Sequence, residues 1–246
     1  MQAHRLPARQ GVAWIIIGFR LFRANMPLLS ILTFVFLMTF TLMLKLSIIG
    51  AILFTVAQPV INLAIANVCR AVSTKGRQIN AQDLQAGLRT RRTDLLKLGG
   101  LQLIGSILLM LIMAALDIKP DPAQPEQLPR IFAVVALLSS PMLLAFWFAP
   151  ILCGWHDLPP LKALFFSLVA GLRNWRAFVI YALSVAAIIV VPSLLATFAT
   201  QVSATFGQIV ATAVEIVIVI VMLPVVLTGA YVSYRDIFTV NDDAAP

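Results

Sequence analysis

One acidic residue stands out by its position in this 246-residue chain, because Glu215 is the only acid in the middle of a long apolar segment. An ionisable group inside a membrane-spanning helix marks a functional site by default, since its charge is costly to hold in lipid. A carboxyl group at such a position could carry protons in coupled transport. The structural alternative is that Glu215 is protonated, or hydrogen-bonded to Gln201, Gln208 or a neighbouring helix.

A second polar set, Gln58, Asn62 and Asn67, interrupts another apolar segment. Gln58 and Asn62 are four residues apart and share one face of a helix. We expect these side chains to lie inside a helix bundle. Because hydrogen bonds between helices in membranes contribute ~0.6 to 2 kcal/mol each, the set favours adhesion between helices over a substrate path.

His156 and Asp157 are adjacent at the end of a further apolar segment. They lack a nearby nucleophile and a third metal ligand. Cys69 and Cys153 show neither metal-ligand spacing nor a disulfide framework. The sequence therefore predicts no catalytic residue, no metal site and no cofactor.

Composition decides the class of protein. Hydrophobic residues make up 61% of the chain and charged residues only 11%, with a mean hydropathy of +0.96, whereas soluble domains carry ~25% charged residues. A soluble fold is excluded. We predict an all-α, polytopic transmembrane helix bundle that forms a single integral membrane domain over residues 1–246.

The apolar runs define six spans. Residues 26–68 contain one charge, Lys45, and because one span needs about 20 residues, this stretch must cross twice. The predicted spans form three hairpins and cover residues 26–44, 47–68, 98–116, 131–152, 177–199 and 209–232. Four prolines in residues 117–130 predict an extended loop between the third and fourth spans.

The basic residues set the predicted orientation. With six spans, fifteen of the 18 Lys and Arg residues fall on one side, and only Lys45, Lys119 and Arg130 on the other. Basic loops stay in the cytoplasm, so we expect a bacterial inner-membrane protein with both termini cytoplasmic. The net charge of +8 predicts contact with anionic head groups on that side. Nucleic acid is not expected as a partner, because the charges flank the spans.

A short glycine-arginine motif recurs before each hairpin. Residues 18–23 (GFRLFR) align without gaps on residues 171–176 (GLRNWR), and residues 87–92 (GLRTRR) form a weaker copy. The chain is thus predicted to contain three repeats, about residues 6–70, 79–157 and 158–236, each a juxtamembrane helix followed by a hairpin. The shared glycine indicates a close helix contact or a turn at each copy. The residues that define the motif are Gly18, Arg20, Arg23, Gly87, Arg89, Arg92, Gly171, Arg173 and Arg176.

The three juxtamembrane helices differ in character. The first, which carries Trp14 and Phe22, is amphipathic and typical of an interfacial helix in the membrane plane or beneath the bundle. The second is expected over residues 81–91, where Asn80 and Asp83 have capping-box spacing. The third, residues 161–175, is almost wholly apolar and should pack into the bundle.

The segment from Leu6-Pro7-Ala8 to Arg23, followed by paired spans and the recurring motif, resembles a family of uncharacterised proteobacterial six-span inner-membrane proteins. More loosely, it is similar to the membrane domain attached to some glycerophosphodiester phosphodiesterases. The resemblance implies a multi-helix inner-membrane protein. The phosphodiesterase activity does not transfer, because its acid and histidine motifs belong to a catalytic domain that is absent from this sequence.

Three classes of function remain. The leading one is a non-enzymatic scaffold, envelope factor or module that binds another membrane protein. A transporter or channel for a small or amphipathic solute would require Glu215 and the face from Gln58 to Asn67 to line one cavity. A lipid-processing enzyme would require His156, Asp157 and a basic residue such as Arg173 to converge.

Overall fold

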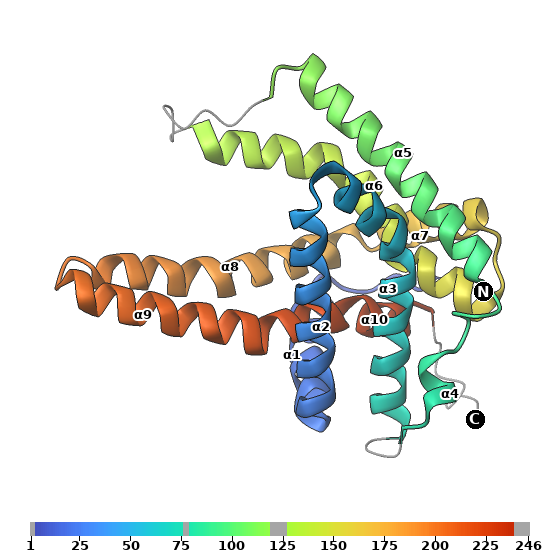
Figure 1. Cartoon of the computed structure of the whole chain (residues 1–246), viewed down its shortest axis with the longest axis horizontal. Coiled ribbons are helices and arrows are strands. Elements are labelled where there is room, and N and C mark those ends of the chain that lie inside the picture. The colour runs from blue at the N-terminus through green and yellow to red at the C-terminus, as the bar shows by residue number, and fades with distance from the viewer. Residues whose placement is uncertain (1–2, 76–78, 119–126, 239–246) are drawn as a thin grey trace. The chain divides into compact units, whose positions relative to one another are not determined.

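The computed structural model describes residues 3–75, 79–118 and 127–238, and all regular secondary structure in these ranges is helical (Figure 1). Within these ranges, six helical segments are long and apolar enough to cross a membrane. This confirms the predicted all-α, six-span class. The spanning segments are α2 (Met26–Lys45), α3 (Ser47–Lys75), α5 (Arg92–Ala115), α6 (Leu128–His156), α8 (Trp175–Ala199), and α9 (Ala204–Val217), which continues through the π-helical turn η2 (Ile218–Met222) into α10 (Leu223–Phe238).

Helix boundaries extend beyond the apolar runs. The sixth span begins in α9 at Ala204, not at residue 209 as predicted, because the side chain of Ser203 caps the helix by accepting a hydrogen bond from the N–H of Phe206 at 3.0 Å. Two other helices, α3 and α6, continue several residues past the predicted spans at the ends that carry basic or polar residues. Residues 119–126 of the predicted proline-rich loop lie outside the described ranges.

Three shorter helices precede the hairpins: α1 (Gln10–Ala24), α4 (Ala81–Leu84) and α7 (Pro160–Arg173). The predicted helix over residues 81–91 is wrong in length, since α4 has only four residues and turns follow it. Gly87 adopts φ +73°, a left-handed conformation that ends helices. The start of α4 agrees with the predicted capping box, because the N–H of Asn80 donates to the carboxylate of Asp83 at 3.1 Å.

Packing divides the chain into two compact units, each built from separate stretches of sequence. Unit 1 consists of Met1–Thr41, Ile65–Leu84 and Arg173–Pro246, and unit 2 of Leu42–Ala64 and Gln85–Leu172.

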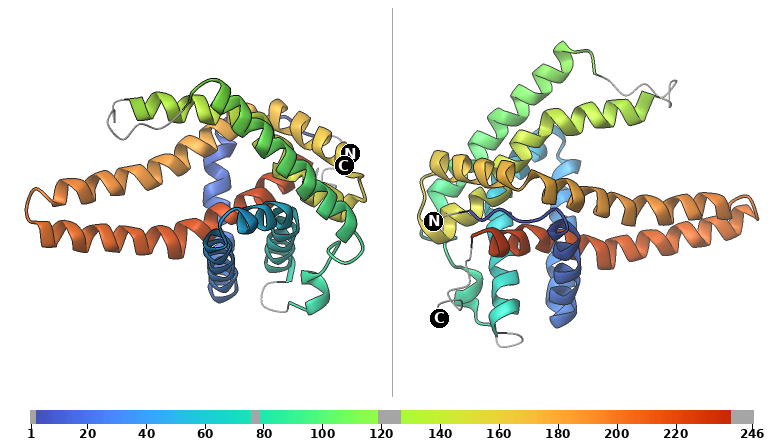
Figure 2. Two further views of the ribbon diagram at one scale, coloured as in Figure 1. Left: turned by 45° about the horizontal axis from the view of Figure 1, so that its top comes forward. Right: turned by 180° about the vertical axis from the view of Figure 1, so that it is seen from behind.

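In unit 1, the N-terminal helix α1 packs against α8 and α10, near the opposite end of the sequence. Trp14 of α1 is 1% exposed and lies where α1 packs against α8. Its ring is 5.2 Å from that of Phe178 and 6.0 Å from that of Tyr181. Gly18 permits the approach of α10, because a Cβ there would lie 2.7 Å from Oγ1 of Thr228. The helices α8 and α9 run side by side away from this core, as two further views show (Figure 2).

In unit 2, α5 packs against α6, and α7 lies on α6 through a stripe of small buried residues. Gly171 in this stripe lies close to the side chain of Leu144, since a Cβ there would lie 2.9 Å from its Cδ2. The hydroxyl of Ser167 donates to the carbonyl of Leu144 at 2.7 Å and accepts from the N–H of Phe148 at 3.0 Å. The Ser167 hydroxyl thus bridges the N–H of one residue of α6 and the carbonyl of the residue one turn before it. The stripe consists of Ala163, Ser167, Ala170 and Gly171.

Each glycine of the recurring motif therefore lies at a close helix approach or at a turn. Gly18 and Gly171 are buried against neighbouring helices, and Gly87 has a positive φ beside the carbonyl of Gly154. The wider repeat of helix and hairpin stays a prediction.

Candidate functional site

Glu215 lies in the last turn of α9, immediately before the π-helical turn η2. The residue is exposed, and within the described part of unit 1 no hydrogen bond or ion pair engages its side chain. The expected local bonds to Gln201 and Gln208 are therefore not formed. Pro224 follows η2 and lacks an N–H, which accounts for a local change of helical register. Single π-helical turns inside α-helices also occur frequently at functional sites.

The predicted amide set is divided between the two units. Gln58 and Asn62 belong to unit 2 and are half-buried, whereas Asn67 belongs to unit 1 and is 1% exposed. The side chain of Gln102 in α5 donates a hydrogen bond to that of Gln58 in α3. This pair joins two predicted spans, as expected for adhesion between helices.

Asn67 performs a related task in unit 1. Its side-chain amide donates to the carbonyl of Leu84 at 3.0 Å and so holds the end of α4 against α3. A cavity lined by both Glu215 and the face from Gln58 to Asn67, which a transporter would require, stays a prediction.

The most complete polar cluster of unit 1 was missed at the sequence level. Asp236 near the end of α10 accepts hydrogen bonds from Nε2 of Gln10 at 2.6 Å and from Nε1 of Trp14 at 3.1 Å. Its side chain is only 14% exposed, and Arg235 contacts its second oxygen at 3.5 Å. The carboxylate therefore fastens α1 to α10. The sequence signal for this cluster was that Asp236 is an acidic residue directly after a span, in a chain with few acids. The partners of Asp236, however, lie more than 220 residues away in sequence.

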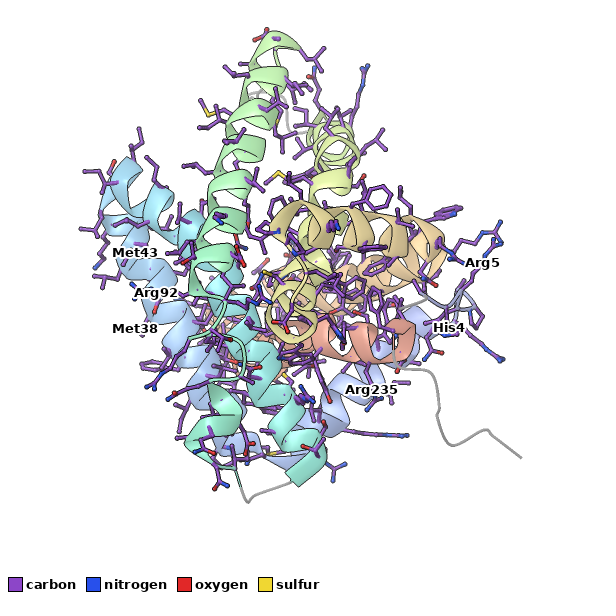
Figure 3. All side chains as sticks on the ribbon, turned by 90° about the vertical axis from the view of Figure 1, so that its right-hand side faces the viewer. His4, Arg5, Met38, Met43, Arg92 and Arg235 are labelled. Carbon is purple, nitrogen blue, oxygen red and sulfur yellow. The ribbon has the colours of Figure 1, made fainter. Side chains whose placement is uncertain are left out.

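The segment before α1 is held by one buried amide. Asn174 is 1% exposed, and its side chain donates to the carbonyl of His4 at 2.9 Å and accepts from the N–H of Leu6 at 2.8 Å. The N–H of His4 donates to the carbonyl of Ile237 at 2.9 Å. His4 and Arg235 are labelled in Figure 3, where the N-terminal segment passes the end of α10. Asn174 lies inside the motif copy at residues 171–176, so this copy holds the N-terminal segment in place.

At the corresponding end of unit 2, the acid is solvent-exposed. Asp157 is in a left-handed C-cap conformation after α6, and its side chain, 71% exposed, pairs with Arg91 at 2.6 Å. This hydrogen bond raises the pKa of the Arg91 guanidinium above its ordinary value. Arg91 also reaches Asp94 at 3.3 Å, and Lys97 contacts the same carboxylate at 3.2 Å. Asp157 thus takes part in a surface ion network.

The arginines of the recurring motif share one property: all six are exposed. Exposed cations near the ends of membrane spans can contact phosphate groups of lipids. Arg92 at the start of α5 is labelled in Figure 3. The others are Arg20, Arg23, Arg89, Arg173 and Arg176.

Within the described ranges, no group of three or more His, Cys, Asp or Glu side chains has a geometry that could hold a metal ion. The described pockets are walled mainly by apolar side chains. The smaller one lies in unit 1, and the larger, in unit 2, has Lys97 as its single ionisable residue.

Comparison with known proteins gives a relative of similar length. The chain is 31% identical over its full length to "Probable inner membrane protein BTH_II0599" of Burkholderia thailandensis, and the alignment covers 97% of that protein. No family model matches the sequence. No solved structure matches it either.

Proposed function

This chain belongs to the same family as the probable inner membrane protein of Burkholderia thailandensis, and we propose that it serves as a non-enzymatic module that holds another membrane protein against its spans. Its six candidate spans make it a multi-pass inner-membrane protein. In the proposed orientation both termini and the exposed motif arginines are cytoplasmic, where anionic head groups attract them. The looser similarity to the membrane domain of glycerophosphodiester phosphodiesterases stays a prediction.

The observation that carries the proposal is how the buried and half-buried polar groups are bonded. Gln58 is bonded to Gln102, Ser167 to the backbone of α6, and Asn67 to the backbone at the end of α4. Each bond fixes one helix to another segment. These groups therefore hold helices together within each unit.

The outer faces of the spans support the same proposal. Only between 11% and 22% of the residues in each spanning window are buried within the protein. Large apolar side chains such as Phe34, Leu183 and Ile209 are 60–64% exposed. Lipid tails satisfy such surfaces, but so do helices of a partner protein, which pack against them by van der Waals contact.

The test is site-specific photocrosslinking in native membranes. A photoreactive residue in place of Phe34, Leu183 or Ile209 is expected to yield one discrete protein adduct, and the same partner should co-purify at fixed stoichiometry. Arg20 is the control position, because it is also exposed but lies on the juxtamembrane helix α1. Adducts to lipid alone at every span position would overturn the proposal.

Two further assays on the purified protein in liposomes address the competing functions. Proton-coupled solute uptake that is lost in Glu215→Gln would establish a transporter. The transport assay is motivated by the exposed carboxylate of Glu215 beside η2. Lipid turnover that is lost in Asp157→Asn would establish a lipid-processing enzyme. Either result would replace the proposed function.

A further inference from the structure

Unit 2 contains an open groove between the first turns of α5 and the start of α7. Its α5 wall is formed by Lys97, Gly100, Leu101 and Ile104, and the opposite wall by Pro159, Pro160 and Leu161. Its volume is about 500 Å³, which lies within the range of ~300 to 1,000 Å³ typical of small-molecule sites. Ile104 and Leu161 are 63% and 69% exposed. Apart from Lys97, every lining residue is apolar or glycine.

The groove exists because two adjacent glycines of α5 have different surroundings. Gly99 packs directly against the backbone of Val56 in α3, where a Cβ would clash. A Cβ on Gly100, in contrast, would meet no atom within 4 Å. Gly100 is thus not required by packing within unit 2. A glycine inside a helix costs about 1 kcal/mol relative to alanine. What Gly100 provides in return is open space, because it has no side chain to fill the groove.

The charge around the groove is positive. Arg91, Arg92, Lys97 and Lys162 lie at this end of α5 and α7, against the acids Asp94 and Asp157, which leaves a net charge of +2. Asp94 is shared between Arg91 and Lys97. The side chain of Lys97 is 63% exposed, so a second anion can reach its ammonium group.

We propose that this groove binds one acyl chain of an anionic glycerophospholipid, with the lipid phosphate at Lys97. An apolar trough that ends at an exposed cation matches both parts of such a lipid. The inference rests on the membrane orientation given with the proposed function, which places Lys97 at the anionic head groups of the cytoplasmic leaflet. It adds a defined lipid site to a module that was proposed to bind protein.

The test uses phosphatidylglycerol and phosphatidylcholine that carry the same photoreactive acyl chain, each mixed into proteoliposomes with the purified protein. Adducts are mapped by peptide mass spectrometry. We expect phosphatidylglycerol to label the groove residues about fivefold more than phosphatidylcholine, which corresponds to ~1 kcal/mol for one basic residue at an anionic surface. Lys97→Gln should abolish this preference. Gly100→Phe should remove groove labelling by both lipids, because the ring occupies the trough.

Matched controls separate these effects from general changes. Ile107→Phe adds an aromatic ring to α5 outside the groove lining, and Lys45→Gln removes a cation at the link between α2 and α3; both should label as the parent does. Equal labelling by the two lipids, or unchanged labelling of Gly100→Phe, would overturn the inference, as would adducts to protein alone. Lys97→Gln changes an exposed side chain and provides the test even if Gly100→Phe does not insert.

The two proposals can fail separately. Preferential labelling by phosphatidylglycerol without any protein adduct at Phe34, Leu183 or Ile209 would retain the lipid site and reject the partner-binding function. A protein adduct at those positions with equal labelling by the two lipids would do the reverse.

Discussion

The carboxylate of Asp236 should be a principal determinant of the stability of unit 1. It accepts hydrogen bonds from Gln10 and Trp14 of α1, and its replacement by alanine leaves the indole N–H of a residue that is 1% exposed without an acceptor. A hydrogen bond to a charged group contributes ~1.5–3 kcal/mol. We therefore expect Asp236→Ala to lower the free energy of unfolding by about 3 kcal/mol.

Thermal unfolding of the purified protein in detergent provides the measurement. At ~2–4 °C per kcal/mol for a chain of this size, Asp236→Ala should lower Tm by roughly 6–12 °C. Asp236→Asn retains one carbonyl acceptor and should lower Tm by about half as much. Trp14→Phe keeps the ring contacts with Phe178 and Tyr181 but loses the N–H donor.

Asp157→Ala is the matched control, since Asp157 also follows a span but its side chain is 71% exposed, against 14% for Asp236. Exposed ion pairs contribute ~0–1 kcal/mol, so its Tm should change by no more than about 4 °C. The reasoning is refuted if Asp236→Ala changes Tm no more than Asp157→Ala does. It is equally refuted if the effects of Trp14→Phe and Asp236→Ala are additive, because contacting partners should show a coupling energy of at least ~0.5 kcal/mol.

Three further predictions follow from the spans. A reporter fused after Val240 should be cytoplasmic and one inserted near Pro122 periplasmic, as the basic asymmetry requires; an outer location of the C-terminal fusion would contradict an even number of spans. Glu215→Gln should leave thermal stability unchanged, since the exposed carboxylate has no partner in the described part of unit 1, and a marked loss of stability would show that it has one. Gly99→Leu should reduce the yield of folded protein in size-exclusion chromatography, because its Cβ would clash with the backbone of Val56. Gly100→Leu should be tolerated, and equal behaviour of the two variants would contradict the different surroundings of these glycines.

The sequence by itself determined the class and the number of spans. The backbone N–H and C=O groups of an apolar run of about 20 residues can be hydrogen-bonded in lipid only if the run is a helix. The spans were therefore predictable from the paired apolar runs, with Lys45 and the proline-rich loop marking where one span ends and the next begins. Local signals were also readable, as the bond between Asn80 and Asp83 shows. They failed over residues 85–91, where turns follow α4 and Gly87 adopts a positive φ.

Tertiary structure alone decided which polar groups meet. Asp236 and Trp14 are 222 residues apart, and the two glycines Gly99 and Gly100 are adjacent but face a packed helix and open space respectively. Helical periodicity places a residue on a face, but it does not say which segment covers that face. In lipid, apolar surface gives little preference between partner helices. The pairing of segments therefore depends on small residues and single hydrogen bonds, whose partners are distant in the chain and become identifiable only when the helices have packed.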